Sequence, residues 1–213
     1  MKHEAGRTAA LHQVKHWFLD LDGTTYLGDT PLPGALAFVH HLRRHGIGYT
    51  FLTNNSSKSA SEYGDKLQRL GFPVSEQRVF SSARATGRYL QQQLPGARVF
   101  LLGTSSFAAE LGSFGVDLVE EHADTVVLGY DTFLTYPRLA TACRLLAAGA
   151  RYIASHPDIN CPSPQGPLPD AGAVMALLAA STGRQPDTIV GKPSVRFLHE
   201  AAEQAGVALS DCG

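Results

Sequence analysis

Short apolar runs alternate with amphipathic stretches along most of the chain. Trp17–Leu19 is a continuous apolar run that ends abruptly in a polar loop, as is typical of strands covered on both faces. After Pro33 and Gly34, apolar residues recur at helical spacing until Gly46, and Ile47–Leu52 is a second apolar run. The pattern therefore predicts a strand, a helix and a second strand in the first quarter of the chain.

The same alternation continues to the last residues. Further helices are predicted over 58–70, 83–94, 107–111, 137–147, 171–180 and 195–204. Further strands are predicted over 99–102, 125–128, 151–154 and 188–190. Because strands that alternate with helices form parallel sheets, the predicted fold class is α/β. The one long irregular segment is 157–169, which holds five prolines in thirteen residues.

Composition and charge exclude several classes of protein. Among 213 residues, 44% are apolar and 17% charged, which is typical of a globular chain. A net charge of −1 provides no large positive field for nucleic acid or anionic lipid. The three cysteines form no CxxC pair, which argues against a disulfide framework and a zinc site. We therefore expect a small-molecule partner and a reducing, cytoplasmic environment.

No segment predicts membrane insertion or secretion. The longest apolar run, Ala173–Ala180, is eight residues long, whereas a membrane-spanning helix needs about 20. The first sixteen residues carry charged side chains and three histidines but no continuous apolar stretch of the kind found in signal peptides. The sequence therefore predicts a soluble protein without membrane partners.

Three predicted strand ends carry reactive side chains. They are Asp20 and Asp22 after the first strand, Thr53–Asn55 after the second, and Lys192 after the last. Ligands of open parallel sheets bind beyond the carboxyl ends of the strands, so we expect these groups to converge on one crevice. Residues two apart in extended backbone point the same way, which directs Asp20 and Asp22 at a common point.

Each motif also has a simpler interpretation. Counted from Asp20, a calcium loop would need glycine where Thr25 stands and glutamate where Pro31 stands, so that interpretation fails. A nucleotide P-loop fails because Pro186 and Pro193 occupy positions that require Gly and Ser or Thr. A lone lysine after a strand is usually a solvated surface group, and a lone Thr-Asn-Asn cluster is usually a helix cap. The three motifs together, in this order, favour a phosphate site.

The motifs resemble those of a known superfamily. FLDLDGTTYLGDTPLPGA, FLTNNSS and VGKPS are similar to the haloacid dehalogenase (HAD) phosphohydrolases, and in particular to their class IIA branch of NagD-like and 4-nitrophenylphosphatase-like enzymes. VVLGYDTFLTYPRL and HPDINCPSPQGPLPDAGA resemble parts of that branch's cap domain. The resemblance implies a Rossmann-like parallel-sheet core over residues 1–77 and 186–213, with an inserted α/β C2-type cap over 78–185.

The resemblance also implies a two-step phosphoryl transfer. Asp20 would attack phosphorus to give an aspartyl phosphate, and Asp22 would protonate the leaving oxygen and then activate water. Thr53 and the Asn54 amide would hold phosphoryl oxygens, while Lys192 would neutralise charge near Asp20. Mg²⁺ would bind the Asp20 carboxylate and the Asp22 main-chain carbonyl.

Further substrate contacts are implied around this centre. Gly23, Asn54 and Asn55 would border the phosphate, and Asp158 and Asn160 would approach the leaving group from the cap. For Asp158, Asn160 and Asp170 the sequence leaves two interpretations open, because polar residues in such a loop also satisfy its own backbone.

One family motif is missing. Only 21 residues follow Lys192, and their three acids, Glu200, Glu203 and Asp211, do not resemble the fourth motif, which supplies another metal ligand. The core is therefore expected to be C-terminally incomplete, with a weakened magnesium site. The absent strand would also leave an unpaired, apolar edge along Trp17–Leu21 that destabilises the chain or is covered by a second copy.

Two functions are therefore expected. The first is a Mg²⁺-dependent phosphomonoester hydrolase acting on a small phosphorylated metabolite. The alternative is a catalytically weak or inactive phosphate-binding or self-associating remnant of such an enzyme. A homodimer is the expected oligomer. Nucleotide monophosphates, phosphoglycolate and sugar phosphates share the reacting group, so the sequence does not choose among them.

Overall fold

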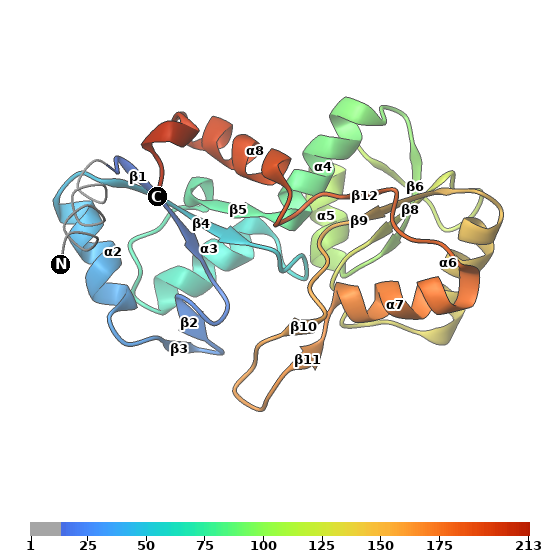
Figure 1. The fold of residues 1–213 in the computed structure, drawn as a ribbon, viewed down its shortest axis with the longest axis horizontal. Coiled ribbons are helices and arrows are strands. Elements are labelled where there is room, and N and C mark those ends of the chain that lie inside the picture. The colour runs from blue at the N-terminus through green and yellow to red at the C-terminus, as the bar shows by residue number, and fades with distance from the viewer. Residues whose placement is uncertain (1–13) are drawn as a thin grey trace, which may run out of the picture.

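The protein consists of two lobes, each built on a parallel sheet (Figure 1). The structure is a computed structural model and describes residues 14–213. The predicted absence of a signal segment concerns residues that lie almost wholly outside this range. Within it, no helix is both long and apolar enough to cross a membrane.

The first lobe holds a three-stranded sheet in the order β1-β4-β5. Its strands are β1 (His16–Asp20), β4 (Gly48–Thr53) and β5 (Val79–Ser81). The pairings are parallel, with Asp20 opposite Leu52 and Thr53 opposite Ser81. The carboxyl ends of β1 and β4 therefore meet at one edge of the sheet.

The second lobe holds a five-stranded parallel sheet in the order β12-β9-β8-β6-β7. Its strands are β6 (Arg98–Leu102), β7 (Asp117–Leu118), β8 (Thr125–Leu128), β9 (Arg151–Ala154) and β12 (Thr188–Ile189). Because β12 pairs with β9, the chain enters the Lys192 segment from this second sheet.

Seven helices of the described residues cover the two sheets. They are α2 (Ala35–Arg44), α3 (Ala60–Arg69), α4 (Ser82–Gln93), α5 (Ser105–Ser113), α6 (Tyr136–Ala147), α7 (Ala171–Thr182) and α8 (Val195–Ala205), with short 3₁₀ turns η1 (Glu76–Arg78) and η2 (Leu209–Asp211). Strand residues alternate between two faces, so each sheet buries both. In β6, Val99 packs on one face while Phe100 and Leu102 pack on the other.

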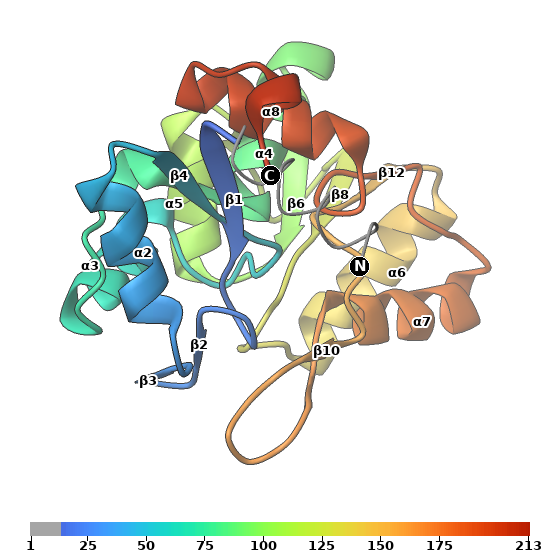
Figure 2. The ribbon, with the colours of Figure 1, turned by 60° about the vertical axis from the view of Figure 1, so that its left-hand side comes forward.

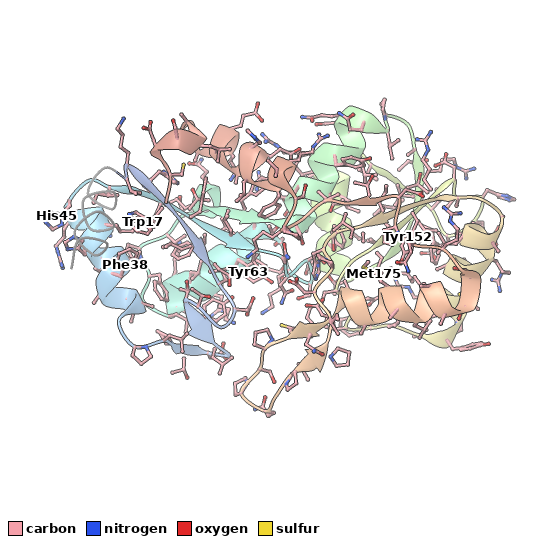
Figure 3. The ribbon with its side chains drawn as sticks, viewed as in Figure 1. Trp17, Phe38, His45, Tyr63, Tyr152 and Met175 are labelled. Carbon is pink, nitrogen blue, oxygen red and sulfur yellow. The ribbon has the colours of Figure 1, made fainter. Side chains whose placement is uncertain are left out.

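One apolar cluster joins the two lobes. It combines Leu52 and Phe80 of the first sheet with Val99 and Val127 of the second, and α8 adds Phe197. The outer faces have separate clusters, which contain Tyr63 of α3 in one lobe and Tyr152 of β9 with Met175 of α7 in the other (Figure 3). The two sheets are therefore held together by shared packing as well as by the connecting chain.

Two hairpins lie below the sheets in the view of Figure 2, and Gly28 of the first lies against Pro164 of the second. The first is β2 (Tyr26–Leu27) with β3 (Thr30–Pro31), and the second is β10 (Asn160–Cys161) with β11 (Leu168–Pro169). Gly28 at the turn of the first hairpin has φ +57°, and a Cβ there would lie 2.6 Å from Pro164 Cγ. Glycine is needed at this position for both reasons.

The predicted α/β class is confirmed, and the missed elements are all short. The strands β5 and β7 and the two hairpins were not predicted, because runs of two or three residues show no clear periodicity. The segment 157–169, predicted to be irregular, contains the second hairpin. The domain boundaries after residues 77 and 185 stay predictions; β5, which follows the first of them, pairs with β4 of the first sheet.

The edge of β1 was predicted to be unpaired along its whole length, but only part of it is. Gly213 N donates to His16 O at 3.0 Å, and Phe18 N donates to Gly213 O at 2.9 Å. Cys212 lies opposite His16 in a parallel bridge. The last residues therefore pair with the first half of β1, while the rest of this edge has no neighbouring strand within residues 14–213.

Replacing Phe80 by alanine tests the shared cluster. Phe80 is fully buried and its ring centroid lies 5.0 Å from that of Phe197. Because Phe80→Ala leaves a cavity between the lobes, we expect the free energy of unfolding to fall by about 3–5 kcal/mol. Urea denaturation measures the loss, with Phe133→Ala, whose side chain is 71% exposed, as the matched control. Equal midpoints for both variants would contradict the shared core.

Candidate functional site

A cavity of about 330 Å³ lies beyond the carboxyl ends of β1 and β4. Its lining comes from both lobes and comprises Asp20, Asp22, Thr53, Asn54, Asn55, Asp158, Asn160, Cys161, Pro162, Asp170, Lys192 and Pro193. The predicted convergence of the three strand ends is therefore confirmed. Gly23 lies beside this cavity: a Cβ on it would be 3.5 Å from Pro162 Cγ.

Both carboxylate oxygens of Asp20 have fixed partners. Lys192 Nζ donates to Oδ1 in a short ion pair, although the two residues are 172 positions apart. Thr24 Oγ1 donates to Oδ2 at 3.1 Å, and Thr25 Oγ1 donates to the Asp20 carbonyl at 2.5 Å. The Asp20 side chain is 42% exposed. Asp20 is thus an oriented, charge-paired carboxylate that a ligand in the cavity can still reach.

Asp22 lies in a different environment. Its Oδ2 is buried and has no hydrogen-bond partner among the described residues. Burial raises the pKa of the Asp22 carboxyl, the negative charge of Asp20 acts in the same direction, and the positive charge of Lys66 opposes both. Two neighbouring carboxyl groups therefore lie in different environments: Asp20 is paired with lysine, whereas burial raises the pKa of Asp22 and so favours retention of its proton.

The loop after β4 is held rigid by its own side chains. Thr53 Oγ1 accepts from Asn55 N at 3.0 Å, so the hydroxyl proton of Thr53 is left to donate into the cavity. Asn55 Oδ1 accepts from Ser57 N at 3.0 Å, and Tyr63 OH donates to Asn55 O at 3.1 Å. Such a preorganised turn presents donors to an anion without further ordering.

Asn54 connects three segments. Its Oδ1 accepts from Lys192 N at 2.8 Å, and its Nδ2 donates to Lys192 O and to Asp158 Oδ2, both at 3.0 Å. These bonds fix the backbone from which the Lys192 side chain reaches Asp20. Asn54 also ties this backbone to the loop that precedes the second hairpin. The family resemblance implied a phosphate contact for the Asn54 amide, but this bridging role was not predicted.

The second lobe supplies mostly polar groups to the cavity. Asp170 is 3% exposed and caps α7, with Oδ1 accepting from Ala171 N at 2.6 Å and lying 2.9 Å from His156 Nε2. Burial, aided by the charges of Asp22 and Asp170, raises the pKa of the Cys161 thiol to about 12, so this thiol stays protonated and unreactive. Cys161, Pro162 and Pro193 were not predicted to line the site.

The oxygen atoms at Asp20 and Asp22 are of the type that binds a hard metal cation. The Asp20 carboxylate faces the cavity, and the Asp22 carbonyl oxygen accepts no hydrogen bond from any described backbone group. Magnesium in proteins takes one or two carboxylates and keeps several waters, so this set fits. Within residues 14–213, no cluster of three or more His, Cys, Asp or Glu side chains forms a metal site.

Comparisons with known proteins agree with this geometry. A family model described as haloacid dehalogenase-like hydrolase matches residues 17–117. The acid sugar phosphatase of Staphylococcus aureus is 36% identical over 202 residues, covering 94% of this chain and 78% of the relative. The Asp20 and Asn54 segments both fall within the matched family model.

Solved structures give the same result. The 4-nitrophenylphosphatase from Thermotoga maritima superposes with a TM-score of 0.91 at 43% identity, covering 95% of this chain and 78% of that one. A protein described as a putative nagD protein gives 0.88 at 44% identity, with 92% and 78% coverage. A glycerol phosphate phosphatase from Mycobacterium tuberculosis, solved in complex with magnesium, gives 0.85 at 33%, with 92% and 60% coverage.

The raised pKa of Asp22 predicts that this residue lowers stability at neutral pH. When the pKa of a carboxyl is higher in the folded than in the unfolded chain, the protein loses stability as the pH rises through the folded-state pKa. We therefore expect Asp22→Asn to raise the melting temperature at pH 7 in EDTA, with the gain shrinking as pH falls toward 3.8, the ordinary pKa of the group.

Thermal unfolding between pH 3.5 and 8 measures this gain. Asp65→Asn, which changes an exposed aspartate of α3, is the control and should show no such pH dependence. A melting temperature for Asp22→Asn that is below the wild-type value at pH 7 would contradict the assignment.

Proposed function

Because the chain belongs to the haloacid dehalogenase-like hydrolases, in their class IIA branch, and is a phosphatase, we propose that it hydrolyses small phosphomonoesters with Mg²⁺ through an aspartyl phosphate. The observation that carries this proposal is the Lys192–Asp20 ion pair in the cavity. It places a charge-neutralising ammonium beside an oriented nucleophile, which is what attack on a phosphate dianion requires.

In the first step an Asp20 carboxylate oxygen attacks phosphorus. The bond to the leaving oxygen breaks, and the protonated Asp22 carboxyl donates its proton to that oxygen. The raised pKa of Asp22 supports this role, because a general acid must hold its proton at the working pH. The products are an aspartyl phosphate on Asp20 and a free alcohol.

In the second step the ionised Asp22 removes a proton from water, which attacks the same phosphorus. The bond to the Asp20 oxygen breaks, inorganic phosphate leaves, and Asp22 is again protonated. The Thr53 hydroxyl and the backbone amides of the following loop donate to the phosphoryl oxygens. Lys192 offsets negative charge through both steps.

Magnesium would be held by the Asp20 carboxylate and the Asp22 carbonyl oxygen. When bound, it neutralises phosphoryl oxygens and helps to align the phosphate for in-line attack. The cavity lining itself favours a bound cation, because it contains four aspartates and one lysine. A phosphate would add further negative charge.

The cavity volume of about 330 Å³ is near the small end of ligand pockets, which supports a small metabolite as substrate. The relatives named above act on sugar phosphate, nitrophenyl phosphate and glycerol phosphate, according to their names. No nucleic-acid polymer is proposed as a partner, and the homodimer stays a prediction.

A second candidate function has one observation in its favour. The expected metal ligands are only the Asp20 carboxylate and the Asp22 carbonyl oxygen, and within residues 14–213 no three His, Cys, Asp or Glu side chains cluster to hold a metal. These few metal ligands would suit a chain that binds phosphate with Lys192 and Thr53 but hydrolyses phosphomonoesters slowly or not at all. Retained phosphate binding without turnover would favour this candidate.

Asp20→Asn tests the nucleophile. An amide does not attack phosphorus effectively, so we expect the Mg²⁺-dependent hydrolysis of 4-nitrophenyl phosphate to fall by on the order of 10³-fold or more. Nitrophenolate release across a magnesium titration, with EDTA as zero point, measures it. Asp65→Asn is the control. If Asp20→Asn keeps wild-type turnover, Asp20 is not the nucleophile.

Asp22→Asn tests the order of the two steps. 4-Nitrophenolate leaves without protonation, so the first step should survive, whereas the second lacks its base and slows about 10²- to 10⁴-fold. Rapid mixing should therefore show a burst approaching one nitrophenolate per chain, and acid quenching should recover phosphate covalently bound to the protein. A slow rate with no burst and no phosphoprotein would contradict the covalent route.

A further inference from the structure

The charged groups of the cavity are unevenly distributed. Lys192 lies beside Asp20, on the side where the phosphate is expected. The groups that the second lobe contributes are Asp158, Asn160, Cys161, Pro162 and Asp170. Both charged residues of this set are carboxylates, and Lys192, the one Lys or Arg of the described lining, is paired with Asp20 instead. The leaving group of a substrate would therefore face hydrogen-bond acceptors and negative charge.

Asp170 is the buried member of this set. It is 3% exposed, and its Oδ1 holds both of its hydrogen bonds, to Ala171 N and to His156 Nε2. Its Oδ2 has no hydrogen-bond partner among the described residues, although Asp170 lines the cavity. Because Oδ2 has no protein partner and Asp170 lines the cavity, this oxygen is available to accept from a donor on a bound ligand.

A chain of buried groups fixes the orientation of Asp170. His156 Nδ1 lies 2.8 Å from Ser155 Oγ, which lies 3.2 Å from Ser56 Oγ, and all three residues are fully buried. Ser56 Oγ in turn accepts from Tyr130 N at 2.8 Å. If each hydroxyl donates onward from Ser56 to Ser155 to His156, the Nε2 proton of a neutral imidazole remains to donate to Asp170.

This arrangement anchors Asp170 to the first lobe. Ser56 belongs to the loop after β4, next to the residues proposed to hold the phosphate. The carboxylate is therefore positioned relative to the reacting group through a buried network, whereas Asp158 and Asn160 lie in a more exposed loop. A buried hydrogen-bond network holds its members in one arrangement.

We propose that Asp170, positioned by His156, selects the leaving group: its Oδ2 accepts a hydrogen bond from a hydroxyl of a neutral polyol, and its charge disfavours leaving groups that carry a carboxylate or a second phosphate. This proposal rests on the proposed phosphatase function. His156 acts through Asp170 and is a positioning residue. Of the substrates that the sequence leaves open, the proposal favours sugar or polyol phosphates over phosphoglycolate.

Asp170→Asn is the sharpest test. The Ala171 amide and the His156 Nε2 proton both need an oxygen, so the asparagine oxygen replaces Oδ1 and its NH₂ group replaces Oδ2. An acceptor that faces the leaving group thus becomes a donor. We expect the ratio of kcat/KM for glycerol 1-phosphate to that for 2-phosphoglycolate to fall about 10- to 100-fold. A merely structural role for Asp170 would lower both values alike and leave the ratio unchanged.

His156 is tested by a pair of variants. Because His156→Leu removes the donor to Asp170, it should lower the same ratio, while His156→Gln, whose amide can still donate, should retain more of it. If thermal denaturation shows that Asp170→Asn does not fold, Asp170→Ser is used instead. Serine keeps a cap for α7 but removes the charge. Asp65→Asn is the control for all variants.

The outcomes separate the two proposals. Wild-type chain that fails to hydrolyse 4-nitrophenyl phosphate with Mg²⁺ refutes the proposed function. The selectivity is then measured as binding of the two esters by calorimetry, with and without Asp170→Asn. An unchanged ratio in Asp170→Asn or Asp170→Ser, by turnover or by binding, overturns the selectivity proposal whether or not the chain is active.

Discussion

The ion pair between Lys192 and Asp20 is the interaction on which the site depends. It joins the end of β1 to a segment entered from the other sheet, and Asn54 fixes the backbone from which Lys192 reaches across. Without the lysine, several carboxylates would share one small cavity, and a phosphate would meet repulsion. The sequences of the short loops after β4 and β12 are therefore constrained, because each loop must hold hydrogen-bond donors at a defined position.

The sequence predicted well the fold class and the convergence of the three strand ends on one cavity. Continuous apolar runs ending in Asp20 and Thr53 indicated buried parallel strands, and the rule that ligands bind at their carboxyl ends placed both residues together. The resemblance implied a core sheet and an α/β cap, but the pairing of β12 with β9 of the second sheet was not predicted, because the partner of a strand depends on tertiary packing that a local pattern does not contain.

What local patterns missed is mostly long-range hydrogen bonding. Asn54 binds residues 104 and 138 positions away, and His156 reaches Asp170 across a hairpin. The tripeptide around His156 contains polar residues that equally well serve a loop, so its buried network is visible only when Ser56 is brought beside Ser155. The pairing of Gly213 with Phe18 at the edge of β1 is another such case, since no apolar run in the sequence predicts this contact.

The apolar cluster that spans both sheets limits how the cavity can open. A rigid rotation of one lobe against the other would separate Leu52 and Phe80 from Val127 and expose a packed interior to water. The β10–β11 hairpin rests on the β2–β3 turn through Pro164, and most of its residues are exposed. The packed interior between the lobes therefore fixes the spacing between the groups that the two lobes contribute to the cavity.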